Sequence, residues 1–367
     1  MALSTVAFLI PERPQLLLEA CLLAPPQRLE AWQHWLHLTR FDDVDIASFD
    51  LLPAVCHFNR GQPFAEMDRL RGLFRHNWAI NQERLSAVLP LLSALQTEGF
   101  EPIPIKGVAL AFTTYGSLGA RRIADVDVLV NEDRFMGAAA LAARLGFEPA
   151  SGWIWPRAGL KSWPFRGPRG VEVDLHARPL EEPWDAESRG AMLDSLNTVS
   201  IGHQRLKTLS PAASLVVALM HGLRHDARGH HHWVLDAALL IRQGGVDWNQ
   251  VLRLARLLDL GRALSSGLRT VSSFLPAESV PPVSIPAGPH PVREAVEHHF
   301  RTRAPGGLSG ALPNLFFLYQ RERRAGLWDA GFPEFLRAVW QVPDEMSLTA
   351  VVVEKAGRRV ASGLGRA

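Results

Sequence analysis

Apolar side chains recur at intervals of three and four residues through the first hundred positions of the chain. This spacing places them on one face of an α-helix. The helices that it predicts cover residues 16–23, 29–38, 47–58 and 64–97. Pro90 lies inside the last of these segments, and we expect it to kink or restart a long helix there. Residues 1–98 are therefore predicted to form an N-terminal helical region.

The pattern changes near residue 100, where short runs suited to β-strands begin. The strands predicted there cover residues 101–105, 123–130 and 170–176, and the last two alternate apolar and polar positions. Between them, residues 131–146 predict a helix, with Asn131 suited to its N-terminal cap and Gly146 to its end. We expect the Trp-, Pro- and Gly-rich residues 151–170 to form a hairpin or loop over the strands.

Helical spacing returns after residue 200. Ser210 followed by Pro211 is a favourable helix start, and the Pro-rich residues 276–290 predict a loop or linker. Further helices are expected over residues 312–340 and 346–362. The whole pattern predicts an α+β fold in which a small mixed β-sheet core is flanked by N-terminal and C-terminal helical regions. The predicted regions are residues 1–98 (helical), 99–200 (α/β core) and 201–367 (helical).

Composition and charge narrow the class of protein. The 367 residues are 47% hydrophobic and 21% charged, which is typical of globular proteins. A net charge of +2 is too small for a protein that coats nucleic acid, so we expect no long nucleic-acid partner. Two cysteines, Cys21 and Cys56, cannot form a disulfide framework and suit a reducing compartment. Since no signal-peptide pattern and no run of 18 apolar residues is seen, we predict a cytoplasmic protein without a membrane segment.

Two aspartates in the strand over residues 123–130 are the main candidates for chemistry. Asp125 and Asp127 are two residues apart, so both side chains project from one face of the strand. The valines between and after them project from the other face into a core. Adjacent like charges destabilise a strand. A hard divalent cation such as Mg²⁺, which prefers oxygen ligands, is the simplest group to offset this repulsion.

The neighbouring segments supply the other parts that phosphoryl or nucleotidyl transfer needs. Glu172 and Asp174 share one face of the next strand, and either is a candidate third carboxylate. Gly107 stands between a strand and a helix, where a glycine lets backbone N–H groups approach a phosphate. Lys106 and Arg121 are candidate cations for phosphate oxygens. Lys106 is informative because the chain has only four lysines among its 39 basic residues.

In these residues the chain is similar to the uncharacterised bacterial nucleotidyltransferase family of the DNA polymerase beta-like nucleotidyltransferase superfamily. The resemblance covers most of the chain. The motif positions that carry it are Lys106, Gly107, Tyr115, Arg121, Asp125, Asp127, Gly146, Phe147, Asp174, His176, His221, His225, Trp233 and Asp236. One departure is Gly107-Val108 in place of the superfamily's usual Gly-Gly or Gly-Ser, with a long spacing to Asp125. The phosphate grip is therefore expected to differ, with Lys106 or Arg121 taking part.

The resemblance implies an enzyme that depends on Mg²⁺ or Mn²⁺. It would move a nucleoside monophosphate from a nucleoside triphosphate, with ATP expected, to an acceptor and release pyrophosphate. The residues to which it assigns catalysis and metal binding are Asp125, Asp127 and Asp174, the last preferred over Glu172. The residues to which it assigns nucleotide binding are Lys106, Gly107 and Arg121.

The motifs do not identify the acceptor. We favour a small molecule, a peptide or a protein side chain, with a role in natural-product biosynthesis. One alternative is a toxin-like transferase that acts on tRNA, for which the arginine-rich residues 301–324 and 357–366 would supply a basic surface. Another alternative is a non-catalytic nucleotide-binding or scaffolding protein. Neither the preferred nucleobase nor the oligomeric state can be read from the sequence.

For two groups of side chains, the sequence leaves more than one role open. His221, His225 and residues 230–232 suit a polar network with Asp236, or the lining of an acceptor pocket. A zinc site is less favoured, because no cysteine lies nearby and Gly222 replaces the Glu of the helical zinc-protease motif. A cluster of tryptophans suits core packing or an aromatic wall for a base or hydrophobic acceptor. The tryptophans of this cluster are Trp153, Trp155 and Trp163.

Overall fold

From residue 10 on, where the described part of the chain begins, the N-terminal region contains four helices. The computed structural model describes residues 10–150, 161–182, 184–223, 230–279, 285–302, 308–324, 328–340, 342 and 345–353. The first helices are α1 (Glu12–Leu22), α2 (Pro25–Leu38), α3 (Ile46–Phe58) and α4 (Met67–Thr97). The four predicted helical segments are thereby confirmed. Pro90 does not restart the last of them, because α4 continues through it as one helix of 31 residues.

Within the described residues, the central sheet has five strands with mixed pairing. In spatial order the strands are β1 (Ile103–Pro104), β2 (Val126–Leu129), β5 (Glu172–His176), β4 (Ser162–Arg166) and β3 (Glu148–Pro149). Strands β2 and β5 run parallel, and the other neighbours run antiparallel. The helices that connect β1 to β2 and β2 to β3 are α5 (Lys106–Thr113) and α6 (Phe135–Arg144). The α+β class with a small mixed sheet is confirmed.

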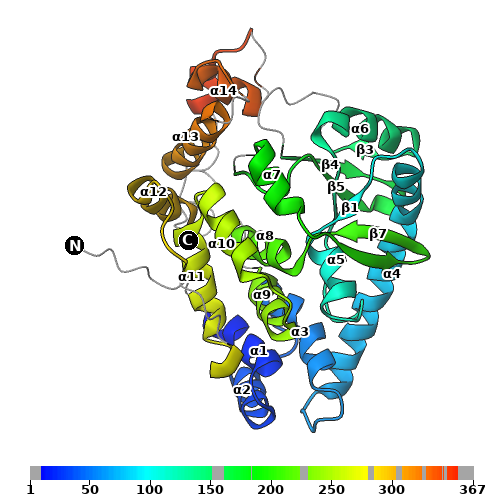
Figure 1. The fold of residues 1–367 in the computed structure, drawn as a ribbon. Coiled ribbons are helices and arrows are strands. Elements are labelled where there is room, and N and C mark those ends of the chain that lie inside the picture. Colours follow the sequence, from blue (N-terminus) through cyan, green and yellow to red (C-terminus); the bar gives the residue numbers. More distant parts are fainter. Residues whose placement is uncertain are drawn as a thin grey trace.

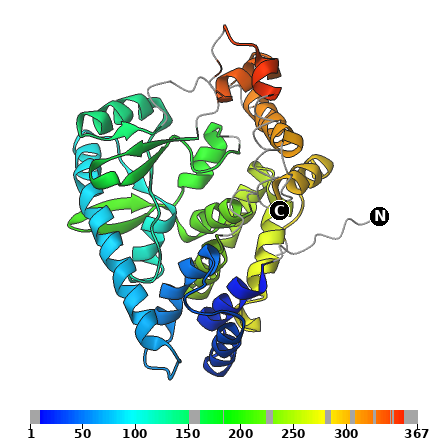
Figure 2. The ribbon, with the colours of Figure 1, turned by 180° about the vertical axis from the view of Figure 1, so that it is seen from behind.

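Strand β2 is covered on both faces, and all four of its residues are buried. Val126 and Val128 join a hydrophobic cluster with residues of α4 and α6, as their alternation predicts. Leu129, on the opposite face, joins the core that the N-terminal and C-terminal helices form. Figures 1 and 2 show the sheet between α4 and α6 on its outer side and the C-terminal helices on the other. The aspartates of β2 therefore face the helical part of the molecule.

The helix expected over residues 131–146 is confirmed, with a different start. The Asn131 side chain accepts a hydrogen bond from the Asp133 backbone N–H and so caps a short 3₁₀ turn, η1 (Glu132–Arg134). Helix α6 follows from Phe135. Gly146 then adopts a φ of 82°, a conformation that favours glycine, and ends the helical segment as predicted.

Residues 197–208 form a β-hairpin, which the sequence analysis missed. Strands β6 (Asn197–Ile201) and β7 (Gln204–Thr208) pair antiparallel as a separate two-stranded sheet. Gly202 adopts a φ of 60° in the tight turn between them. The expectation of helix from residue 200 was therefore wrong over this stretch. Each strand is only five residues long, and so short an alternation was overlooked beside the strong helical pattern that follows.

The rest of the described chain is mainly helical. The Ser210 hydroxyl caps α8 at its start, as predicted, by accepting a hydrogen bond from the Ala213 backbone N–H. The helices of this part are α7 (Ala186–Leu193), α8 (Pro211–Gly222), α9 (His232–Gln243), α10 (Trp248–Leu257), α11 (Gly261–Ser272), α12 (Pro291–Thr302), α13 (Leu308–Arg324) and α14 (Phe332–Trp340). Short 3₁₀ turns are η2 (Pro168–Gly170) and η4 (Ala277–Ser279). Among the described residues, no helix is both long and apolar enough to cross a membrane. The boundaries of the three predicted regions stay a prediction.

Candidate functional site

The parallel pairing of β2 and β5 brings two predicted carboxylates together. Asp127 and Asp174 are partners in the register of the two strands. One ligand atom each from Asp127, Asp174 and His176 lies within 4.8 Å of the others. Asp125 precedes β2 by one residue and is not part of this close group. The sheet therefore forms a compact Asp–Asp–His cluster with Asp125 beside it.

Asp127 is the centre of the cluster. Its Oδ1 accepts a hydrogen bond of 2.6 Å from Lys106 Nζ and one of 2.8 Å from His176 Nε2. Burial acts to raise the pKa of Asp127, but the Lys106 ammonium and the hydrogen bond from His176 hold that pKa well below its usual range. Asp127 is therefore ionised. In this state of the protein, Lys106 and His176 supply the positive charge that offsets the carboxylates.

Both ring nitrogens of His176 face hydrogen-bond acceptors, an arrangement that favours the doubly protonated ring. Its Nε2 faces Oδ1 of Asp127 at 2.8 Å and Oδ2 of Asp174 at 3.2 Å, and carboxylates only accept hydrogen bonds. Its Nδ1 lies 3.2 Å from the backbone carbonyl oxygen of Arg178, which is also only an acceptor. Burial opposes this charge, yet the two carboxylates raise the pKa of His176 above its ordinary value. The sequence analysis named His176 only through the family resemblance, and it gave the residue no role.

Asp174 retains an unused oxygen. Its Oδ2 accepts a hydrogen bond of 2.9 Å from Ser162 Oγ, whereas its Oδ1 is buried without a hydrogen-bond partner among the described residues. Burial raises the pKa of Asp174, but the contact with His176 outweighs it and lowers that pKa. Glu172, the rival candidate, is exposed and pairs with Arg166 at 3.3 Å. An unsatisfied buried carboxylate oxygen beside Asp127 fits a hard cation such as Mg²⁺ or Mn²⁺.

Asp125 is the least stabilised of the three aspartates. Burial, and then the charge of Asp127, raise the pKa of Asp125 to about 6. Lys106 and His176 together balance two of the three carboxylates. The third negative charge is the one that a bound cation would stabilise most. The donor set of carboxylates thus fits a divalent cation on charge as well as on chemistry.

Lys106, rather than Gly107, makes the turn at the start of α5. Lys106 adopts a φ of 54°, in the left-handed region that costs a non-glycine residue energy and is often found at functional sites. The strained backbone directs its side chain to Asp127. Gly107 has no positive φ, and a Cβ there would lie 3.6 Å from the guanidinium of Arg121, an ordinary van der Waals contact. The expected glycine turn is therefore corrected to a turn at Lys106, with Gly107 packed against Arg121.

Arg121 is held by Asp236, a residue of α9. Its Nε and Nη2 each donate a hydrogen bond of 3.0 Å to the two oxygens of Asp236. The hydroxyl of Tyr115 donates a further hydrogen bond of 2.7 Å to the same carboxylate. Both side chains of the ion pair are nearly buried. The structure therefore places Arg121 over the start of α5, engaged with a protein carboxylate.

The loop that leads from α5 to Asp125 is anchored on α4. The side-chain amide of Asn81 donates to the backbone carbonyls of Leu118 at 2.6 Å and Arg121 at 2.8 Å, and its oxygen accepts from the Ile123 N–H at 3.2 Å. Asn77, one turn earlier, donates to the Gly119 carbonyl at 2.9 Å. These asparagines were missed by sequence reasoning. Their only signal is that they are buried polar positions on an amphipathic helix, four residues apart.

A cavity of about 260 Å³ adjoins the carboxylates and joins three parts of the chain. Lys106, Asp125 and Asp127 line one side of it. The residues that line it from α3, α8 and α9, or just before α9, include Asp50, His221, His230, His232 and Asp236. Asp50 was missed by sequence reasoning, since nothing links it to the strand motifs. It forms an ion pair with Arg122 and lies 3.3 Å from Nδ1 of His230.

His232 is the least satisfied side chain of this cavity. It is 6% exposed, and neither ring nitrogen has a hydrogen-bond partner among the described residues. Burial, and then the charge of Arg121, hold the pKa of His232 well below its ordinary value, so the ring is neutral. His221, His230 and His232 line this cavity together with the carboxylates, and its role as the acceptor pocket stays a prediction. His225 lies outside the described residues.

Trp163 has a packing role. It is 2% exposed and contacts Phe165, with ring centroids 5.4 Å apart. The packing interpretation therefore holds for this tryptophan. Trp153 and Trp155 lie outside the described residues, as does most of the stretch that was expected to form a loop over the strands.

The fold and the carboxylate cluster together define a nucleotidyltransferase-like protein. The model of a family described as "uncharacterised nucleotidyltransferase" matches residues 51–276, more than half of the chain, and the chain belongs to this family. A crystal structure of an antigenic nucleotidyltransferase-like protein from Paracoccidioides brasiliensis is 20% identical, over 50% of this chain and 93% of that chain, with a TM-score of 0.32. No curated protein matches the chain. Family membership supports nucleotidyl transfer in general.

Proposed function

We propose that the protein transfers a nucleoside monophosphate from a nucleoside triphosphate, preferably ATP, to an acceptor and releases pyrophosphate. The observation that carries this proposal is the register of β2 and β5, which pairs Asp127 with Asp174, whose Oδ1 is buried without a hydrogen-bond partner among the described residues. Asp125, Asp127 and Asp174 would hold Mg²⁺ or Mn²⁺. When bound, such a cation stabilises negative charge on the transferring phosphoryl group and orients the nucleotide.

Lys106 is proposed to hold the triphosphate. Its ammonium contacts Asp127 and lies at the N-terminal end of α5, where the positive end of the helix dipole also favours an anion. An incoming phosphate would contact the Lys106 ammonium either in place of Asp127 or together with it. Arg121 is proposed to act beside it, over Gly107, but its pairing with Asp236 means that it positions the helix start more than it grips phosphate directly.

The chemical step needs a proton acceptor for the nucleophile. An acceptor oxygen attacks the α-phosphorus, the bond to the pyrophosphate oxygen breaks, and pyrophosphate leaves with the electron pair. Asp174 is proposed either to hold the cation or to take up the acceptor's proton, because its Oδ1 has no hydrogen-bond partner among the described residues. His176 fixes Asp127 and Asp174 in place by contacting both. The acceptor is proposed to be a small molecule, peptide or protein, in natural-product biosynthesis in the cytoplasm.

Calorimetry with ATP, with and without Mg²⁺, tests the nucleotide site. We expect Mg²⁺ to strengthen ATP binding in the wild type, and Asp127→Asn combined with Asp174→Asn to remove that effect. Glu172→Gln is the matched control, because Glu172 lies on the same strand but is exposed and paired with Arg166. An assay of pyrophosphate release then separates transfer from binding alone. An affinity for ATP that changes neither with Mg²⁺ nor with the aspartate substitutions would refute the proposal.

A further inference from the structure

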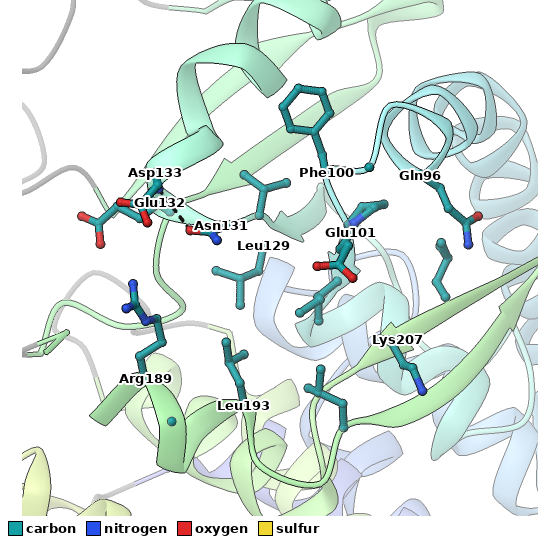
Figure 3. A pocket seen from close by; sticks show the side chains of 18 of the residues that line it. Gln96, Phe100, Glu101, Leu129, Asn131, Glu132, Asp133, Arg189, Leu193 and Lys207 are labelled. Atoms are coloured by element: carbon teal, nitrogen blue, oxygen red, sulfur yellow. Dashed lines mark hydrogen bonds between the residues drawn. The ribbon is translucent and has the colours of Figure 1, made fainter. Parts of the chain in front are cut away.

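A second cavity in the described part of the chain has a lining that shares no residue with the cavity beside the carboxylates. Its volume is about 1070 Å³, and it opens between the end of β2, helix α7 and the β6–β7 hairpin (Figure 3). Leu129 and Leu193 form part of its apolar floor. Further apolar residues that line it are Ile103, Trp184, Leu196 and Leu206. The volume is slightly above the range of about 300–1,000 Å³ that is typical of small-molecule sites.

The cavity lies on the same side of β2 as the carboxylates. Side chains two residues apart point to one face of a strand, so Leu129 shares a face with Asp127. Two strand residues span about 7 Å. A ligand in this cavity would therefore lie against the face of the sheet that carries Asp127. The β6–β7 hairpin lies next to it.

Charged side chains surround the apolar floor in two rows of opposite sign. The acidic residues that line the cavity are Glu101, Glu132 and Asp133, and the basic ones are Arg189, Arg205 and Lys207. In Figure 3, Glu132 and Asp133 lie to the upper left of Leu129 and Glu101 lies to its right, whereas Arg189 lies to its lower left and Lys207 to its lower right. None of the six side chains forms an ion pair or hydrogen bond with the described part of the chain. Each charge is therefore available to a ligand.

This arrangement discriminates between classes of ligand. The three acidic and three basic residues cancel, so the cavity has no net positive charge with which to attract a polyanion such as RNA. An uncharged apolar molecule would leave both rows unused. A peptide in an extended conformation can offer apolar side chains to the floor and charges of both signs to the walls, because its successive side chains point in opposite directions.

We propose that this cavity binds an extended peptide segment that carries both acidic and basic side chains among apolar ones. The part of the inference that makes this segment the nucleotidyl acceptor rests on the function proposed above. The binding of the peptide to the cavity does not depend on that function. The row of Arg189, Arg205 and Lys207 selects the acidic side chains of the peptide, and the row of Glu101, Glu132 and Asp133 selects its basic ones.

A display library of random twelve-residue peptides, selected on the whole protein, is the probe. We expect the wild type to enrich peptides that combine aspartate or glutamate, lysine or arginine, and aliphatic residues. Arg189→Glu combined with Lys207→Glu should weaken a selected peptide at least tenfold in fluorescence anisotropy and shift selection toward basic peptides. Arg256→Glu, an exposed substitution on α10 outside the cavity, is the matched control and should leave binding unchanged. Circular dichroism verifies that all variants fold.

Three outcomes would overturn the proposal. They are a library that yields no enriched peptide, binding that is insensitive to the double charge reversal, and a labelled twelve-nucleotide RNA that binds more tightly and is lost in that variant. Asp127→Asn separates this inference from the proposed function, because it should keep peptide binding while losing Mg²⁺-dependent ATP binding. If peptide binding fails while Mg²⁺–ATP binding persists, the peptide-binding proposal is refuted and the proposed nucleotidyl transfer is not.

Discussion

The carboxylate of Asp236 accepts two hydrogen bonds of 3.0 Å from the guanidinium of Arg121, although 115 residues separate them in the chain. Tyr115 donates to the same carboxylate and completes the contact. The pair joins helix α9 to the loop in front of β2. A residue of the C-terminal helices thereby fixes the position of the segment that delivers Asp125 and Asp127 to the site.

Replacing Asp236 by Ala should destabilise the protein strongly. Arg121 would be left as a buried charge without a carboxylate, which typically costs about 3–5 kcal/mol. Arg121→Lys keeps the charge but loses the two-pronged contact, so a smaller loss is expected. Urea denaturation measures both changes. Glu187→Ala is the control, because its contact with Arg253 is exposed and 4.0 Å long, and its effect should stay within about 0.5 kcal/mol.

Asn81→Ala should loosen the loop that carries Arg121 without touching the carboxylates. The substitution leaves the carbonyls of Leu118 and Arg121 and the Ile123 N–H without their partner, at a cost of about 2–3 kcal/mol. Hydrogen exchange should accelerate in residues 117–124 more than in β5. Gln82→Ala, at the next and exposed position of α4, serves as the comparison. Equal exchange in both variants would mean that Asn81 does not anchor the loop.

Lys106 allows the charge and the backbone strain at the site to be tested separately. Lys106→Ala and Lys106→Gly both remove the ammonium, so each should weaken ATP binding. Only glycine adopts a φ of 54° without penalty, so Lys106→Gly should be more stable than Lys106→Ala by about 1 kcal/mol. Thermal unfolding compares the two variants. If alanine is as stable as glycine, the left-handed conformation at Lys106 is not strained.

Buried histidines should make the protein sensitive to acid. Burial, and then the charge of His230, lower the pKa of His231 to about 4, whereas a histidine in an unfolded chain titrates near pH 6.5. Between these values the unfolded state binds a proton that the folded state does not. Stability is therefore complete above about pH 6.5 and falls as the pH drops toward 4, by on the order of 3 kcal/mol for this residue.

Urea denaturation between pH 7.5 and 4.5 measures this loss. His231→Leu should flatten the dependence in part, since burial also lowers the pKa of His232 and its contribution remains. His203→Leu, in the exposed turn of the β6–β7 hairpin, should leave the pH dependence as in the wild type. A His231→Leu profile that is identical to the wild-type profile would contradict the assignment.

The sequence by itself determined the local order of the α/β core. The alternation around Val126 and Val128 predicted both the strand and the face that enters the core, because side-chain direction in a strand depends only on position along the chain. The same rule set Asp125 and Asp127 on the opposite face. The family resemblance then favoured Asp174 over Glu172, and the structure sets Asp174 beside Asp127.

Only the tertiary structure decided which distant residues complete the site. Three contacts join residues that are far apart in the chain. They are the register of β2 against β5, the contact of Lys106 with Asp127, and the ion pair of Arg121 with Asp236. Periodicity carries no information on such contacts, because they depend on how whole strands and helices pack. The same holds for the cavity beside α7, whose walls come from separate elements and whose opposite charges meet only after the chain has folded.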